Sequence, residues 1–243
     1  MTKTRKSIVA VAFAVLTLCG CAKSSKTIIR MQKMEEGVGS PTTEAQLKDA
    51  IKKYQDRVAD VQLAQAQIGI WYKMLGSRQL DNKMYGEALK SFQKAIEFYP
   101  ENQNLYYWVG VCAGYMAKAS LDFEASGATT QQRYNYLKLA ESSYLRAIEI
   151  EPRYARALYG VAIIDIYEIG DVEKGIPYLE RFLEIETRNT DAMFRLAEAY
   201  YTVYEFDKAV ELYDNIISLT KDEKRKALAE TNKKTVLDAA YTR

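Results

Sequence analysis

The side chains that could carry out catalysis are few in this chain of 243 residues. It contains no histidine, which removes the commonest general base, the usual catalytic triads and every histidine-ligated metal site. Cys112 lies between Val111 and Ala113, and with no histidine to activate its thiol we expect a packed core residue rather than a nucleophile. The sequence also has no phosphate-binding glycine loop of the Walker or Rossmann type. We therefore predict a protein that is not an enzyme and that uses no cofactor and no metal.

Carboxylates are numerous, and most of them occur where a solvated helix face or a helix cap would place them, as Glu97 and Glu149 do. A glycosidase-type pair needs two carboxyl groups about 5 to 9.5 Å apart, and the sequence singles out no such pair. Asp165 is the exception among single residues, because it lies in the apolar run 161–166, where a carboxylate must find a partner or solvent. We expect a structural hydrogen bond there, with a catalytic role as the alternative.

Cys21 has the clearest chemical signal. A basic stretch at residues 3–6 precedes an uncharged apolar run at 8–18, which is typical of a secretory signal and is shorter than the about 20 residues of a membrane-spanning helix. The residues that follow, Leu18-Cys19-Gly20-Cys21, resemble the lipobox of bacterial lipoproteins, although Cys19 stands where that family prefers Ala, Ser or Thr. The resemblance implies cleavage after Gly20 and a lipid on the Cys21 sulfur. An ordinary secretory signal that leaves Cys21 as a free thiol is the alternative.

A lipoprotein signal assigns roles to the first forty residues and a location to the mature protein. Residues 1–20 form the signal peptide, and residues 21–40, which have no sustained apolar period, form a flexible tether. The lipid would hold the mature protein at a membrane of the bacterial cell envelope. Ala22, in place of Asp, implies the periplasmic side of the outer membrane if the sorting rule of enteric bacteria applies.

Charge and cysteine content exclude two further classes. The signal peptide contains three basic residues and no acidic one, so its removal changes 34 basic and 32 acidic residues to 31 and 32, a net charge of −1. Nothing then points to nucleic acid as a partner. After cleavage only Cys21 and Cys112 remain, and with Cys21 lipidated no disulfide can form within the chain.

The composition favours helices as the elements that position these residues, because Gly (12) and Pro (4) are scarce while 48% of residues are apolar. Thr43 and Gln46 have the spacing of a capping box and predict the start of a first helix. From Leu47 to Val61, apolar residues follow at steps of four, three, four and three, which is one stripe of a helix. The stripe continues after residue 64 with a changed phase, and one long helix or two packed helices would both fit.

An internal repeat organises the rest of the chain. Small, aromatic, small and proline residues recur at identical offsets as Ala88, Phe92, Ala95, Pro100 and as Ala140, Tyr144, Ala147, Pro152. Gly175, Leu179, Phe182 and then Ala209, Tyr213, Ile216 take the first three of these offsets. A second pattern precedes each of these, most clearly as Met193, Leu196, Ala197 and Tyr200. The distance from Gly175 to Ala209 is 34 residues, and the first helix of the third repeat is ambiguous by one residue.

These motifs resemble the tetratricopeptide repeat (TPR) family over roughly 69–220. The resemblance implies an all-α solenoid of about four antiparallel helical hairpins, in which small residues allow close approach of two helices and large ones fill the gap. We expect an N-terminal helical segment at 41–68, repeats at about 69–102, 103–154, 155–188 and 190–220, and a C-terminal capping helix at 221–243.

The second repeat is 18 residues too long, because Ala88 and Ala140 are 52 residues apart. We expect a protruding loop or a pair of lengthened helices around Ser120 to Gln132, with a turn at 126–129 and a second helix capped by Thr129. Inserts in solenoids often have a function, and a tolerated surface extension is the alternative.

In the TPR family, fixed positions of the first helix of each repeat line a concave groove. The resemblance implies an aromatic groove with a few polar side chains, suited to an extended peptide or an elongated apolar ligand. Carried over to this sequence, the groove residues are Tyr107, Val111 and Tyr115; Arg156, Tyr159, Ile163 and Tyr167; and Phe194, Glu198 and Tyr201. The alternative is that half of the rings pack between helices.

We therefore expect a membrane-anchored lipoprotein that binds another envelope protein or peptide in this groove, as a scaffold in cell-envelope assembly or maintenance. A second hypothesis comes from residues 105–110, the insert and residues 144–147, which partly resemble the TPR lipoprotein component associated with TRAP transporters. That resemblance implies a ligand-binding accessory of a solute transporter. An enzyme is the third.

Overall fold

The computed structural model describes residues 41–120 and 127–242, and these residues form helices and no strand. In chain order the helices are α2 (Glu44–Asp81), α3 (Tyr85–Phe98), α4 (Gln103–Ala119), α5 (Gly127–Ile150), α6 (Ala155–Ile163), η2 (Ile164–Ile169), α7 (Val172–Ile185), α8 (Thr190–Thr202), α9 (Phe206–Leu219) and α10 (Glu223–Tyr241). The expected all-α fold is confirmed. The chain divides into two compact units, one ending at Leu63 and the other beginning at Ala64.

Helix α2 is continuous across the boundary between the units, so one long helix stands where the sequence left two readings open. Its first turn has the predicted capping box. The Gln46 backbone N–H donates to Thr43 Oγ1 (3.3 Å), and the Thr43 backbone N–H donates to Gln46 Oε1 (3.1 Å). This reciprocal pair satisfies two backbone donors that a helix start otherwise leaves without a partner.

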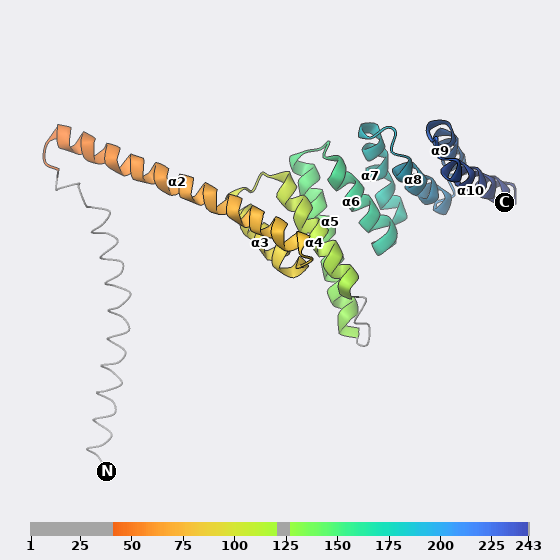
Figure 1. Ribbon diagram of the computed structural model, residues 1–243, viewed down its shortest axis with the longest axis horizontal. Coiled ribbons are helices and arrows are strands. Elements are labelled where there is room, and N and C mark those ends of the chain that lie inside the picture. Colours follow the sequence, from red (N-terminus) through yellow and green to blue (C-terminus); the bar gives the residue numbers. More distant parts are fainter. Residues whose placement is uncertain (1–40, 121–126, 243) are drawn as a thin grey trace, which may run out of the picture. The chain divides into compact units, whose positions relative to one another are not determined.

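From Ala64 onward, each helix packs against the next one along the chain, as Figure 1 shows for α3 to α10. The second half of α2 packs on α3, where the Tyr72 ring stacks on Phe98 and the Tyr99 hydroxyl donates to the Ala66 carbonyl. The pairs α4 and α5, α6 and α7, and α8 and α9 follow, and α10 packs on α9 with Ala229 and Val236 buried. This is the architecture of stacked helical hairpins predicted from the repeats.

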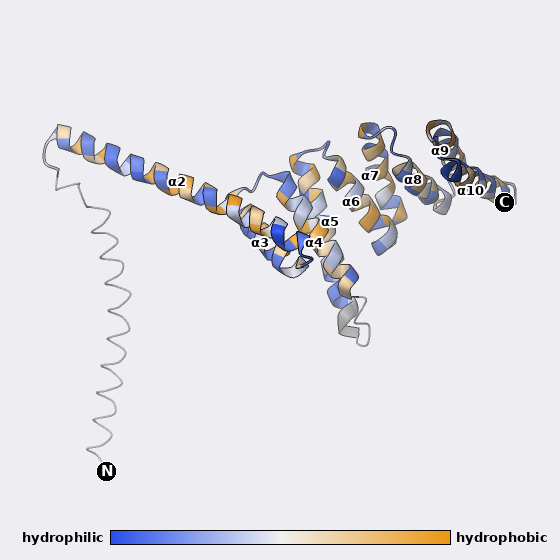
Figure 2. Cartoon of the chain, in the orientation of Figure 1, coloured by the Kyte–Doolittle hydropathy of each residue, from blue (hydrophilic) through white to orange (hydrophobic). Residues whose placement is uncertain are grey.

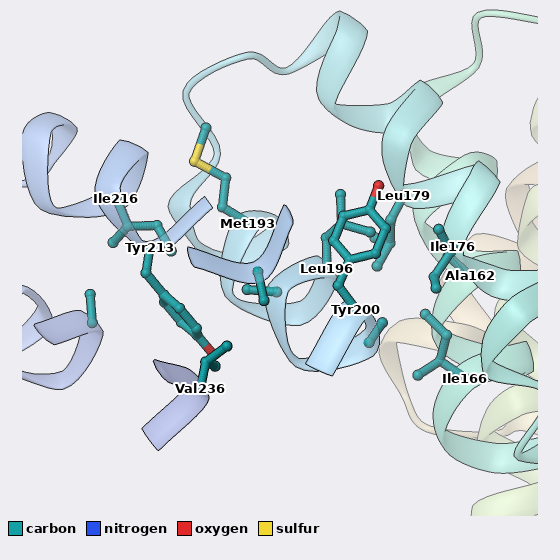
Figure 3. Close-up of a cluster of buried hydrophobic side chains, with 14 residues drawn as sticks. Ala162, Ile166, Ile176, Leu179, Met193, Leu196, Tyr200, Tyr213, Ile216 and Val236 are labelled. Atoms are coloured by element: carbon teal, nitrogen blue, oxygen red, sulfur yellow. The ribbon is translucent and has the colours of Figure 1, made fainter. Parts of the chain in front are cut away.

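Small residues lie at the helix contacts as predicted. Ala88, Ala140 and Ala209 are fully buried. The larger side chains at the following offsets fill the space between helices, and together they form three successive buried clusters. Figure 3 shows the last of these, in which the Tyr200 ring lies beside Leu179 and Leu196, while Tyr213 lies beside Val236 of α10.

The third repeat contains a π-helical turn, η2, directly after α6. Ala140 and Gly175 are 35 residues apart, one more than the period, and a π-helix accommodates one extra residue without breaking the helix. The turn ends at Gly170 with a left-handed backbone (φ 85°), and the Asp171 N–H donates to the Asp165 carbonyl (2.8 Å). The extra residue explains why the sequence pattern is ambiguous by one position here.

The insert of the second repeat lengthens α5, which has 24 residues. The helix begins at Gly127, so residues 127–129 are helical where a turn was expected, and the helix start expected at Thr129 is wrong. Capping-box spacing is a weak signal on its own, because Thr and Gln also fit inside a helix whose neighbour already supports it, and α4 and α5 pack along each other.

The expectations for the N-terminus fall outside the described residues. The signal peptide at 1–20, the lipidated Cys21 and the tether at 21–40 all precede residue 41. Among the helices that the structure describes, none combines the length and the apolar character needed to cross a membrane.

Candidate binding groove

A hollow of about 500 Å³ lies between the third and fourth repeats and the last helix. Three of the predicted groove residues line it, namely Tyr159 of α6 and Phe194 and Glu198 of α8. The rest of its lining consists of Asp191, Arg195, Tyr213, Leu228 and Asn232. Apolar side chains and hydrogen-bonding side chains thus meet in one concave place, which offers a ligand both kinds of contact.

The polar side of this hollow is organised around Glu198. The Tyr167 hydroxyl donates to Glu198 Oε2 (2.7 Å), and Arg195 Nη1 lies 3.5 Å from the same oxygen. The Arg195 guanidinium also lies over the Tyr167 ring, 5.1 Å from its centroid. Burial and the hydrogen bond to Glu198 raise the pKa of Tyr167, so its hydroxyl stays protonated and remains a donor. These contacts hold three exposed side chains in one arrangement.

Asp191, which also lines the hollow, is contacted by Arg225 of α10. The Arg225 guanidinium donates to Asp191 and to the Thr190 hydroxyl (2.6 Å), which links the start of α8 to the capping helix. Because Asp191 and Glu198 each have an arginine beside them, the hollow presents little net charge. The lining therefore offers apolar contact and hydrogen bonding rather than a strong net charge.

A smaller hollow of about 160 Å³ continues from the first. Glu198 and the predicted groove residue Tyr201 line it from α8, and Asn232, Thr235 and Val236 line it from α10. The Tyr201 ring packs against Phe206 (5.8 Å between centroids) and remains 38% exposed. Five predicted groove residues, Tyr159, Tyr167, Phe194, Glu198 and Tyr201, are thus brought into one neighbourhood.

The predicted groove residues of the second repeat lie elsewhere. Tyr107 is half-buried among aromatic rings. The centroid of its ring lies 4.9 Å from that of Trp108, 5.9 Å from that of Tyr144 and 5.7 Å from that of Tyr154. Burial raises the pKa of Tyr107. Tyr115 stacks on Tyr85 of α3 (4.4 Å) and is 45% exposed.

Of the remaining predicted residues, Val111 and Ile163 are half-buried and Arg156 is exposed. None of the ten is fully buried. Position in the repeat therefore does not separate the rings that face the hollow from those that also pack between helices.

The contribution of the capping helix was missed at the sequence level. Leu228 and Asn232 lie one turn apart on α10, and Thr235 and Val236 follow one turn later, so one face of this helix completes the concave surface. The spacing of four was visible in the sequence. The sequence does not show whether this face of α10 only covers the last repeat or also lines a hollow.

The two residues singled out for chemistry belong to the interior. Cys112 is fully buried, and burial raises the pKa of its thiol to about 12, so the expected core role is confirmed. Asp165 is also fully buried, with Lys174 Nζ 3.4 Å from its Oδ1. Its Oδ2 accepts no hydrogen bond within the part of the chain that the structure describes.

The lysine beside Asp165 is shared with a second carboxylate. Lys174 also contacts Glu141 of α5, and Lys138 Nζ lies 2.9 Å from the same carboxylate. Two carboxylates and two lysines thus join α5, η2 and α7 as an internal network. In residues 41–120 and 127–242, no cluster of His, Cys, Asp and Glu side chains could hold a metal ion.

Comparison with known proteins identifies the fold. No family model matches the chain. A TPR repeat-containing protein of Borreliella burgdorferi is 20% identical over 211 residues, covering 86% of this chain and 89% of that protein. A DnaJ homolog subfamily C member 3 homolog of Dictyostelium discoideum is 28% identical over 132 residues, covering 52% of this chain. The chain spans 25% of the length of that second relative.

Solved structures agree with this. A tetratricopeptide repeat protein from Parabacteroides merdae is 17% identical with a TM-score of 0.57, covering 71% of this chain and 61% of that one. MamA is 19% identical with a TM-score of 0.54, covering 72% and 87%. YrrB, described as a TPR protein with an unusual peptide-binding site, is 19% identical with a TM-score of 0.51, covering 85% and 88%. The chain therefore has the TPR-type solenoid fold.

Proposed function

We propose that this protein is a lipid-anchored scaffold that binds an extended segment of another cell-envelope protein in the hollow between α6, α8 and α10. The observation that supports this most strongly is the composition of the hollow, in which Tyr159, Phe194 and Leu228 offer apolar contact beside the polar Glu198 and Asn232. The fold is that of protein-interaction scaffolds, and the similar protein YrrB is described as having a peptide-binding site.

The chemistry of the hollow narrows the expected ligand. Because its acidic groups are already paired with Arg195 and Arg225, a strongly charged peptide gains little there. An apolar or aromatic side chain can contact Tyr159 and Phe194, while the peptide backbone can hydrogen-bond Asn232 and Glu198. We therefore expect a segment with one large apolar residue flanked by uncharged residues.

Attachment to the membrane rests on the motif Leu18-Cys19-Gly20-Cys21. Bacterial lipoproteins have two or three acyl chains on this cysteine, and at about 0.8 kcal/mol per buried methylene these hold a protein stably at a bilayer. Ala22 supports the outer membrane, on its periplasmic side. None of the similar proteins reported above is named as a transporter component, and no other observation favours the transporter accessory.

The groove assignment is tested by affinity capture from the envelope membranes that contain the protein, with identification of what is retained. The variant Tyr167→Ala/Glu198→Ala/Tyr201→Ala removes three exposed side chains around the hollow. We expect it to lose the partner while keeping its helical circular dichroism signal and a cooperative unfolding transition, at a melting temperature that falls by only the few degrees that these surface contacts contribute.

A matched control is Tyr134→Ala/Tyr241→Ala, which removes two tyrosines that are 49% and 90% exposed and line neither hollow. This variant should capture the partner at the unsubstituted level. A folded triple variant that still captures the partner equally well contradicts the groove and directs attention to the insert around Ser120 to Gln132.

The anchor is tested separately by metabolic labelling with a radioactive fatty acid and by fractionation. We expect the unsubstituted chain to be labelled and to sediment with membranes, and the Cys21→Ala variant to lose the label and leave the membrane fraction. A Cys21→Ala variant that still fractionates entirely with membranes contradicts lipid anchoring.

A further inference from the structure

The N-terminal part of α2 has a stripe of apolar side chains exposed to solvent. Leu47 is 47% exposed, Ile51 is 57%, Val58 is 56% and Val61 is 57% exposed, and Tyr54 lies between them on the same stripe. In Figure 2 this part of the helix is mostly hydrophilic, with hydrophobic positions recurring along it. Exposed apolar side chains that line up in this way mark an interaction surface.

The spacing of the stripe is that of a heptad repeat. Ile51 and Val58 take the a positions, and Leu47, Tyr54 and Val61 take the d positions. The flanking e and g positions hold Lys48, Gln55, Arg57, Gln62 and the small Ala50, so no large apolar side chain widens the stripe at e or g. A surface helix that packs on a globular core has a wider apolar face that includes e or g, whereas a strict a and d stripe is the seam of a coiled coil.

We propose that this stripe, Leu47 to Val61, is a self-association surface on which a second copy of the chain packs as a parallel, in-register coiled coil. β-Branched residues at a, as at Ile51 and Val58, favour two strands over three or four. The proposal does not depend on the groove or on the lipid anchor.

The charges beside the stripe favour the parallel register. In a parallel pair, the Arg57 side chain at g lies opposite Gln62 at the following e position of the other copy, and Ala50 lies opposite Gln55. An antiparallel register with Tyr54 beside Val58 of the other copy leaves Leu47 outside the seam and makes the two Arg57 side chains face each other, which is unfavourable for like charges. An antiparallel register with Ile51 beside Tyr54 leaves Val61 outside the seam. The parallel pairing therefore places all five apolar residues in the seam without a pair of like charges.

A membrane surface is a less suitable partner for this stripe than a second copy of the chain. Helices that lie in a bilayer interface are rich in Lys and Arg on the polar face. Here the polar face mixes both signs, with Lys48, Lys52 and Lys53 alternating with Asp49, Asp56 and Asp60. Asp49 pairs with Lys53 (2.8 Å between Nζ and Oδ2), and all three acids would be repelled by anionic lipid headgroups.

The size of the stripe sets the expected strength. Two heptads of half-exposed side chains offer less than the roughly 800 Å² that each partner contributes to a standard interface. The association is therefore in the class of weak, reversible dimers, which are populated at high protein concentration or when both copies are confined to one surface.

Cysteine cross-linking of the full chain tests the register. In a parallel pair, each a position meets itself, so Val58→Cys should form a disulfide-linked dimer on mild oxidation. Asp56→Cys, two residues away and on the far face, should stay at the level of the unsubstituted chain, which contains Cys19, Cys21 and Cys112. Equal cross-linking of Asp56→Cys contradicts the seam. Cross-linking only when Val58→Cys is mixed with Tyr54→Cys contradicts the parallel register.

Analytical ultracentrifugation of the full chain tests the association itself. Ile51→Gln/Val58→Gln removes the a positions while keeping good helix formers, and we expect its dimer dissociation constant to rise about tenfold or more. Leu63→Gln is the matched control, because Leu63 is 70% exposed and lies outside the seam, and its dimer should be unchanged.

The membrane alternative is an outcome of a third measurement. The Cys21→Ala chain is mixed with vesicles of phosphatidylethanolamine and phosphatidylglycerol. We expect no binding that depends on Ile51 and Val58. A chain that remains monomeric at high concentration and whose vesicle binding is lost in Ile51→Gln/Val58→Gln overturns self-association.

Discussion

Tyr167 in the π-helical turn of the third repeat donates a hydrogen bond of 2.7 Å to Glu198 of α8 in the fourth repeat. Both side chains are exposed, and Arg195 lies over the same tyrosine ring. The contact therefore holds two residues of adjacent repeats in place before any partner arrives. Side chains that are already ordered lose less conformational entropy on binding, which strengthens binding by the proposed groove.

A double-mutant cycle measures this contact. We expect Tyr167→Phe and Glu198→Ala each to lower the free energy of unfolding by less than about 1.5 kcal/mol, with a coupling energy of about 0.5–1.5 kcal/mol between them. Urea denaturation of the two single variants and the double variant gives the coupling. A coupling energy of zero contradicts the hydrogen bond in solution.

Two glycines of α4 should respond in opposite ways to the same substitution. A Cβ added at Gly110 would lie 2.6 Å from Cε1 of the buried Tyr144 ring, whereas a Cβ at Gly114 would meet nothing within 4 Å. We expect Gly110→Ala to cost about 1–3 kcal/mol through overpacking, and Gly114→Ala to stabilise the helix by up to about 1 kcal/mol. Thermal unfolding checks both, and the same sign for the two would contradict the packing of α4 on α5.

The sequence predicts the fold better than it predicts the site. Small residues at fixed offsets identify helix contacts directly, because only a small side chain fits where two helices approach closely, as at Ala88 and Ala140. The capping box at Thr43 is equally local, since its donors and acceptors lie within four residues.

Features that depend on tertiary packing were not visible in this way. In the sequence, the π-helical turn after α6 appeared only as an ambiguity of one residue. Its hydrogen-bond pattern depends on how η2 packs against α7, which the sequence does not show. The sequence also did not predict that α10 lines the hollow. Asn232 lies outside the repeats, so no family position assigns it to the groove. The groove positions of the TPR family placed Tyr107 and Tyr201 in the same predicted groove. In the structure Tyr107 packs among several rings, whereas Tyr201 packs against Phe206.

These two tyrosines should therefore differ in their contribution to stability. Tyr107 contacts three other rings, so Tyr107→Ala should lower the free energy of unfolding by about 3 kcal/mol or more. Tyr201 is 38% exposed and contacts one ring, so Tyr201→Ala should cost under about 1.5 kcal/mol. Chemical denaturation measures both. If the two variants lose equal free energy of unfolding, Tyr107 is not a packing residue, and the predicted groove extends into the second repeat.

The buried Asp165 should make stability depend on pH in a narrow window. Burial raises the pKa of its carboxyl group from the ordinary 3.8 to about 6, and the charge of Asp171 acts in the same direction while Lys138 opposes it. Lys174 compensates only in part, because it also contacts Glu141 and its own pKa is lowered by burial and by Lys138. Above pH 6 the folded protein thus contains an incompletely paired carboxylate.

Asp165→Asn tests this consequence. Between pH 3.8 and about 6 the folded chain binds a proton at Asp165 that the unfolded chain has already released, so the free energy of unfolding falls as the pH rises through this window. The asparagine variant lacks this titration, and we expect it to be more stable than the unsubstituted chain at pH 8, by on the order of 2 kcal/mol, with the difference vanishing toward pH 4. Glu184→Gln, an exposed carboxylate of α7, is the control and should leave the curve unchanged. Urea denaturation at a series of pH values gives both curves. If Asp165→Asn is instead less stable at pH 8, the ion pair with Lys174 outweighs the cost of burying the charge, and the network of α5, η2 and α7 stabilises the third repeat through that pair.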